Sequence, residues 1–186
     1  MIGRSSEFHL YPAPGLVMGV FMVDWAMEGL HATPGDKLYA VAETRKCLPD
    51  ALQVIAHCTI GNNRLRILNT GRFAIAMNRP STGDVAEGVR VSVDAEKLDE
   101  FPTMHAWFMH DRRFDKKTMT VALFDEILGG GRRYLALERV AVRFSPRKDW
   151  TGARCTSCGE PVPDTLLTDG LCHACRDEQY YEPLTV

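Results

Sequence analysis

The spacing of apolar residues predicts two helices in the first third of the chain. From residue 14 to residue 30 they recur every three or four positions, with Pro14 at the first position of the helix. Asp24 and Glu28 are the only charges in this segment, so we expect the helix to be central and buried on most sides. A shorter helix is predicted to open at Pro49, because Pro is favoured in the first turn.

Short segments with a strand-like pattern predict one sheet, with strands at residues 37–44, 65–68, 73–77, 89–93 and 137–144. Turn residues at 69–71 predict a hairpin between the second and third of these strands. Helical patterns fill residues 94–131, whereas residues 1–13 are predicted to be irregular. We therefore expect an α+β fold, with a small mixed or antiparallel sheet packed with helices, in a core domain covering residues 1–146.

The composition limits the classes of protein to which this chain can belong. It has 186 residues, 45% hydrophobic and 25% charged, which suits one core plus a small appended module. A net charge of −2 gives no general attraction to nucleic acid or to an anionic membrane. No apolar run approaches the roughly 20 residues of a membrane span, and residues 1–15 lack an apolar signal region. These features predict a cytoplasmic protein without membrane contacts.

Four of the six cysteines form two tight pairs near the C-terminus. Cys155-x-x-Cys158 and Cys172-x-x-Cys175 are separated by 13 residues, which is typical of a tetrahedral thiolate site for zinc. Four protein ligands leave no open position, so we expect the zinc to be structural. The segment 147–186, a linker followed by this zinc finger, is too short to fold on apolar burial alone. The alternative interpretation is a pair of redox dithiols.

The charge of the predicted zinc finger disfavours nucleic acid as its partner. Between residues 153 and 178 there are two arginines against five acidic residues. This balance opposes phosphate binding, so a module for protein contacts or for stabilising the domain is expected instead.

The remaining cysteines, Cys47 and Cys58, lie on either side of the helix that opens at Pro49. Cys58 is predicted near the C-terminal end, where the helix dipole favours a cation and disfavours a bare thiolate. That position suits a metal ligand better than a nucleophile. The alternative is that both residues are small buried apolar side chains, which is common for free cysteine.

Several motifs in order resemble the FmdE/FwdE-like family of formylmethanofuran dehydrogenase proteins, over nearly the whole chain. They are Pro14-Gly15-Leu16, Glu43-Thr44-x-x-Cys47, Asp50-Ala51-x-Gln53-Val54, Cys58-Thr59-x-Gly61, Gly71-x-Phe73-Ala74, Gly88-Val89-Arg90-Val91 and Lys97-Leu98. The resemblance implies an α+β core domain, a metal site in that core and an appended C-terminal zinc finger.

The family's N-terminal motif, F-H-G-H-x-C-P-G, is changed in this chain. His9 matches, but Tyr11 replaces the second His and Ala13 replaces the Cys. The loss of two ligands of this kind weakens affinity for zinc. The resemblance carries His9 and Cys58 over as candidate ligands of a second transition metal in the core, with Cys47 as a third.

Two functional hypotheses follow. The first is a metal-binding accessory protein of anaerobic C1-type metabolism, acting through contacts with oxidoreductase complex subunits and forming a homodimer. The second is an enzyme in which His9 and Cys58, as candidate catalytic residues, flank a metal-dependent site for a small molecule. A zinc-finger regulator is the least favoured alternative.

Overall fold

Two units make up the chain in the computed structural model, Met1–Phe144 and Ser145–Val186. The structure describes residues 1–143, 149–177 and 179–182. The predicted boundary between residues 146 and 147, together with most of the predicted linker, lies outside the described residues.

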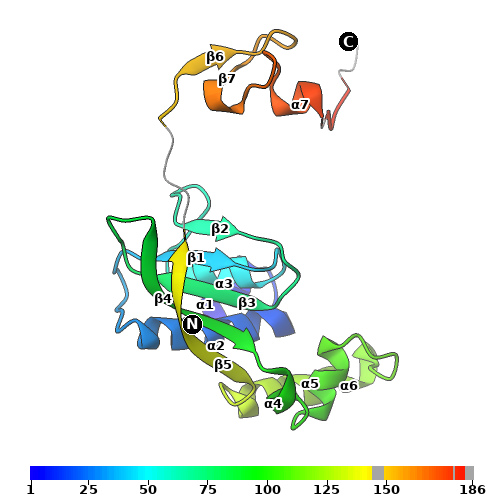
Figure 1. Ribbon diagram of the computed structural model, residues 1–186. Helices are drawn as coiled ribbons and strands as arrows, with labels where there is room; N and C mark the ends of the chain where they lie inside the picture. The colour runs from blue at the N-terminus through cyan, green and yellow to red at the C-terminus, as the bar shows by residue number, and fades with distance from the viewer. Residues whose placement is uncertain (144–148, 178, 183–186) are drawn as a thin grey trace. The chain divides into compact units, whose positions relative to one another are not determined.

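The first unit is built on a five-stranded sheet in the order β2-β1-β3-β4-β5 (Figure 1). Its strands are β1 (Tyr39–Ala42), β2 (Leu65–Ile67), β3 (Ala74–Asn78), β4 (Val85–Val93) and β5 (Leu135–Arg143). The pair β1–β2 is parallel, and the other neighbouring pairs are antiparallel. The predicted α+β class with a small mixed sheet is therefore confirmed.

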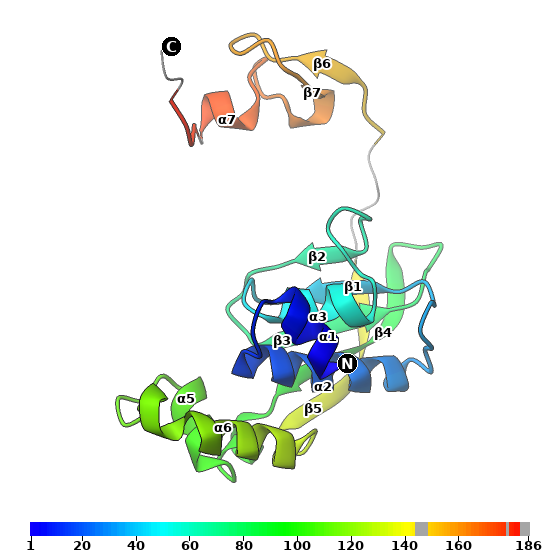
Figure 2. The same ribbon diagram turned by 180° about the vertical axis from the view of Figure 1, so that it is seen from behind.

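Six helices accompany this sheet: α1 (Ile2–Phe8), α2 (Pro14–Gly29), α3 (Leu48–Ile55), α4 (Ala95–Leu98), α5 (Pro102–Phe108) and α6 (Lys116–Gly130). Helices α1 to α3 pack on one face of the sheet, as the reverse view shows (Figure 2). Helices α4 to α6 connect β4 to β5 and lie beyond the ends of these strands, with α6 against α2. None of the helices in the described residues has the length and apolarity needed to cross a membrane.

Helix α2 is the centre of the core, as its pattern predicts. Leu16, Met18, Met22 and Val23 are completely buried. The helix touches α3, α6 and strands β3 and β4, so nearly its whole circumference meets other elements. At Gly19 an added Cβ would lie 3.0 Å from the Leu48 side chain, and this absence of a side chain lets α2 and α3 approach closely.

Two local predictions differ from the structure. Residues 1–13, expected to be irregular, contain α1, which has little periodic pattern of its own and is held by packing against α2 and α3. The predicted hairpin between β2 and β3 is also wrong, because β1 lies between them. Residue Thr70 donates its backbone N–H to the Glu43 carbonyl oxygen at 3.0 Å, so the chain follows β1 beyond β2 before turning back.

The face of the sheet opposite α1 to α3 carries a small separate apolar cluster of Val41, Ala76, Val140 and Val142. It follows from the two-residue period of the strands, since Ala40, Ala42, Ile75 and Met77 belong to the main core instead. An acidic residue, Glu43, is 7% exposed beside this cluster. Its carboxylate receives Arg90 Nε and Arg72 Nε, each at 2.6 Å. Arg90 also reaches Glu138, at 2.8 Å.

The second unit has short elements and almost no apolar core. It contains an antiparallel pair of strands, β6 (Gly152–Arg154) and β7 (Pro161–Pro163), a 3₁₀ turn η1 (Asp164–Leu166) and helix α7 (His173–Arg176). Within its described residues, Cys155 and Cys172 are the only buried hydrophobic side chains. A unit of this kind needs a stabilising interaction other than apolar burial.

The buried carboxylate of Glu43 predicts a dependence of stability on pH. Burial raises the pKa of Glu43, but hydrogen bonds and charge from Arg90, with the charge of Arg72, outweigh it and hold the pKa below its ordinary value. A lowered folded-state pKa gives stability that is complete above the ordinary pKa of 4.5 and is lost as pH falls through the folded value. Urea unfolding between about pH 6 and about pH 3 should show a shallower loss of unfolding free energy in Glu43→Gln than in wild type.

The matched control for this prediction is Glu138→Gln, because Glu138 binds the same arginine but is mostly exposed. We expect this variant to keep the wild-type dependence on pH. Equal slopes for wild type and Glu43→Gln would show that the Glu43 network contributes nothing to the pH dependence of stability.

Candidate metal centre

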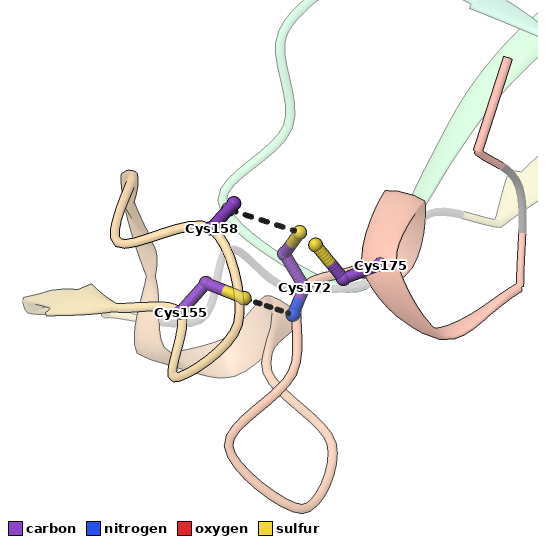
Figure 3. A group of neighbouring side chains, drawn as sticks. All are labelled: Cys155, Cys158, Cys172 and Cys175. Carbon is purple, nitrogen blue, oxygen red and sulfur yellow. Dashed lines mark hydrogen bonds between the residues drawn. The ribbon is translucent and has the colours of Figure 1, made fainter. Parts of the chain in front are cut away.

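The four C-terminal cysteines come from two short segments of the second unit that fold toward one point (Figure 3). Cys155 directly follows β6, and Cys158 lies in the turn before β7. Gly159 adopts φ +76° after this turn, a conformation that favours glycine. Cys172 caps the N-terminus of α7, and Cys175 lies within the helix.

The geometry of the four thiols fits a single metal ion. All four Sγ atoms lie within 4.8 Å of one another. Tetrahedral coordination with Zn–S bonds of about 2.3 Å would separate the sulfurs by about 3.8 Å. The Sγ atoms of Cys158 and Cys172 are already 4.0 Å apart. Because both C-x-x-C pairs converge on one point, the arrangement favours one shared site over two independent dithiols.

Backbone groups support a negative charge at this point. The N–H of Cys172 donates to Cys155 Sγ at 3.3 Å. The N–H groups of Cys158 and Cys172 lower the pKa of Cys155 to about 6. At Cys158 the Glu160 N–H acts in the same direction, but burial and the neighbouring thiols raise the pKa to about 12. Four sulfurs this close cannot all ionise alone, and a bound cation removes that restriction.

In the first unit, His9 lies at the C-terminal end of α1 and contacts α3. Its Nδ1 is 2.6 Å from Oδ2 of Asp50, in the first turn of α3. The ring of Tyr11 lies 5.1 Å from the His9 ring, between centroids. Sequence reasoning missed Asp50 as the partner of His9, because 41 positions separate the two residues and the irregular N-terminus predicted no approach to α3.

Cys47 caps the N-terminus of α3 with φ +55°. Its thiol packs against Gly15, where an added Cβ would lie 3.2 Å from Cys47 Sγ. Burial raises the pKa of Cys47, and the nearby Asp50 charge raises it further. The thiol is therefore protonated at neutral pH, half-buried between α2 and α3.

Cys58 follows the opposite end of α3 and is completely buried. Its Sγ donates to the Leu38 carbonyl oxygen at 3.4 Å, and burial raises its pKa to about 11. Eight residues of helix, about 12 Å, lie between Cys47 and Cys58. Cys58 occupies the main hydrophobic core, which is the alternative that the sequence left open for it.

The expected core ligand set of His9, Cys47 and Cys58 is therefore not assembled. Among the described residues, the C-terminal cysteines are the only group of three or more metal-ligating side chains brought together. Ala13 caps α2 and Tyr11 is exposed, so the two positions that depart from the family motif add no second thiol or imidazole. The residues present do not fit a metal centre containing both Cys47 and Cys58.

An α+β unit followed by a four-cysteine module defines the class of protein to which this chain belongs. Comparison with known families then identifies it more closely. Residues 8–143 match the family model described as "FmdE, Molybdenum formylmethanofuran dehydrogenase operon". Because the match covers most of the chain, the protein belongs to the FmdE family, as its sequence motifs indicate.

A solved structure supports this membership. An FmdE-like protein of tungsten formylmethanofuran dehydrogenase, from Syntrophus aciditrophicus, is 34% identical, with a TM-score of 0.81. The match covers 97% of this chain and 92% of that one, so it extends over both units.

A curated relative is longer than this chain. A probable S-adenosyl-L-methionine-binding protein from Archaeoglobus fulgidus is 29% identical over 195 residues, covering 95% of this chain and 52% of the relative. The chain thus spans about half the length of that protein, and the named binding describes the longer molecule.

The surroundings of Cys58 predict that its thiol does not react in the folded protein. With a pKa near 11 and no solvent contact, almost no thiolate is available for alkylation at neutral pH. Iodoacetamide followed by peptide mass spectrometry should leave Cys58 unmodified in native protein and modify it fully in urea. Cys47, which is half-buried, is the internal comparison, and we expect slow modification there. Modification of Cys58 at the rate of an exposed thiol would contradict its position in the core.

Proposed function

We propose that this protein is a metal-binding accessory protein of anaerobic C1-type metabolism, with one structural zinc in its second unit. The observation that carries the proposal is the convergence of four thiols within 4.8 Å in a unit that has almost no other buried apolar side chain among its described residues. Four thiolates in tetrahedral geometry suit zinc, and they leave no position open for a substrate. The ion therefore stabilises the fold of the second unit.

The accessory role rests on family membership and on the way the motif residues are used. The solved relative is described as an FmdE-like protein of a tungsten enzyme, which supports a place beside oxidoreductase subunits. In this chain the motif residues Cys58 and Glu43 serve the core and the sheet, respectively. We propose that the protein acts in the cytoplasm through contacts with such subunits.

A second candidate function is a metal-dependent enzyme, and one observation favours it. A carboxylate on His9 Nδ1 orients the ring and leaves Nε2 to face a metal, a pairing common at metal-bound histidines. No described set of three donors surrounds this pair, so the geometry supports no particular reaction step. Metal content separates the two candidates.

Elemental analysis of protein purified without oxygen tests both candidates. We expect about one zinc per chain in wild type, as a single four-thiolate site requires. Cys155→Ser should lose the zinc and unfold the second unit, because metal binding supplies its folding energy. Cys58→Ser and His9→Ala, which alter the first unit, should keep the full metal content. A second metal lost in His9→Ala would overturn this expectation and support the enzyme.

We also propose that the protein forms a homodimer through helix α6. Val121 is 72% and Leu128 51% exposed, and with Phe124 they share one face of this helix. Burying such a stripe is favourable, so a second copy is a suitable partner. Light scattering should give twice the chain mass of 20.8 kDa for wild type and the single mass for Val121→Ser with Leu128→Ser. The control is Thr118→Ser on the same helix, and a wild-type monomer would refute the proposal.

A further inference from the structure

The sheet face opposite α1 to α3 contains a shallow cavity of about 380 Å³. Its residues come from β1 to β5 and from the segment before β3. The volume falls within the range of about 300 to 1,000 Å³ that is common for small-molecule sites. This cavity is independent of the cysteine cluster, whose ligands all belong to the second unit.

Strand register explains how the lining is assembled. Arg66, Val41, Ala76, Arg90 and Glu138 are successive cross-strand partners from β2 to β5. Directly opposed residues point to the same face of a sheet, so this row crosses all five strands on the face away from the helices. Val41 and Ala76 supply an apolar floor in the middle of the row, continued by Val142.

The charged part of the lining is cationic overall. It contains three arginines, Arg66, Arg72 and Arg90, and two glutamates, Glu43 and Glu138. Arg90 binds both glutamates, so it is already committed within the protein. The remaining positive charge belongs to the two arginines at the rim, Arg66 and Arg72.

Both rim arginines keep donors for a ligand. Within the described part of the chain, Arg66 makes one hydrogen bond, from Nη2 to the Arg143 carbonyl oxygen at 3.0 Å. Arg72 uses Nε, toward Glu43 Oε2 at 2.6 Å and Thr70 Oγ1 at 3.3 Å. Since a guanidinium has five N–H donors in a planar fork, several donors on each side chain can meet a carboxylate or phosphate.

We propose that this cavity binds a small organic anion, whose carboxylate or phosphate lies between Arg66 and Arg72 and whose apolar body rests on Val41, Ala76 and Val142. The site goes beyond the proposed accessory function, since it gives the first unit a small-molecule ligand. A second copy of this face is a poorer occupant, because two cationic surfaces repel each other.

Calorimetric titration with four probes tests the chemistry of the ligand. Phenyl phosphate and benzoate carry an anion and an apolar ring, benzyl alcohol lacks the anion, and inorganic phosphate lacks the ring. We expect the first two to bind more tightly than the last two, and the order between them distinguishes a phosphate from a carboxylate ligand. Equal binding of benzyl alcohol and phenyl phosphate, or no binding of either anion, would overturn the proposal.

Variants of the rim arginines test the location. Arg66→Gln and Arg72→Gln should each weaken binding of the preferred anion by about tenfold, the effect of losing a charge-assisted hydrogen bond. The matched control is Arg139→Gln, which lies on β5 outside the cavity lining and should bind as wild type does.

Arg66 has no ion pair among the described residues, so Arg66→Gln stays informative even if Arg72→Gln weakens the fold. Thermal unfolding of each variant measures that loss separately. Unchanged affinity in Arg66→Gln, or a change in its light-scattering mass without any effect on anion binding, would contradict the site. The second result would assign this face to contacts between copies.

Discussion

Burial of α2 is the constraint on which the first unit depends. The helix is apolar around most of its circumference, so it is stable only when other elements cover it on several sides. The sheet covers one side, α3 approaches at Gly19, and α6 packs on another side. This arrangement fixes the position of α3 and therefore of its two ends, where Cys47 and Cys58 lie. The chemistry of the two cysteines follows from the packing of a helix to which neither belongs.

The alternation of side chains along the strands gives the sheet two different faces. One face joins the main core, and the other holds a small apolar cluster surrounded by arginine and glutamate. Glu43 illustrates the consequence, because its carboxylate is buried among hydrocarbon and yet remains ionised through Arg90 and Arg72. Breaking one partner of such a group costs more than a surface ion pair contributes. The network therefore holds charge at a fixed place on a solvent-facing sheet.

The sequence predicts those features that depend on local pattern and spacing. Period and punctuation locate α2, α3 and the strands, and each C-x-x-C turn places two sulfurs close together. Helix α1, the position of β2 outside β1 and the pair of His9 with Asp50 depend on tertiary packing, which the pattern does not encode. The core ligand set implied by the family resemblance could have been narrowed from the sequence, because the predicted helix separates Cys47 from Cys58 by about 12 Å. Two thiols at that distance cannot share an ion at Zn–S bonds of about 2.3 Å.

The two units meet the same energetic problem by different means. The first unit buries a continuous core around α2, so its cysteines can serve as apolar residues with raised pKa values. The second unit has too few buried side chains for that solution, and its cysteines converge instead. The same residue type is thus protonated and inert in one unit and arranged to bind a cation in the other. What decides between these roles is how much apolar surface the surrounding chain can bury, rather than cysteine itself.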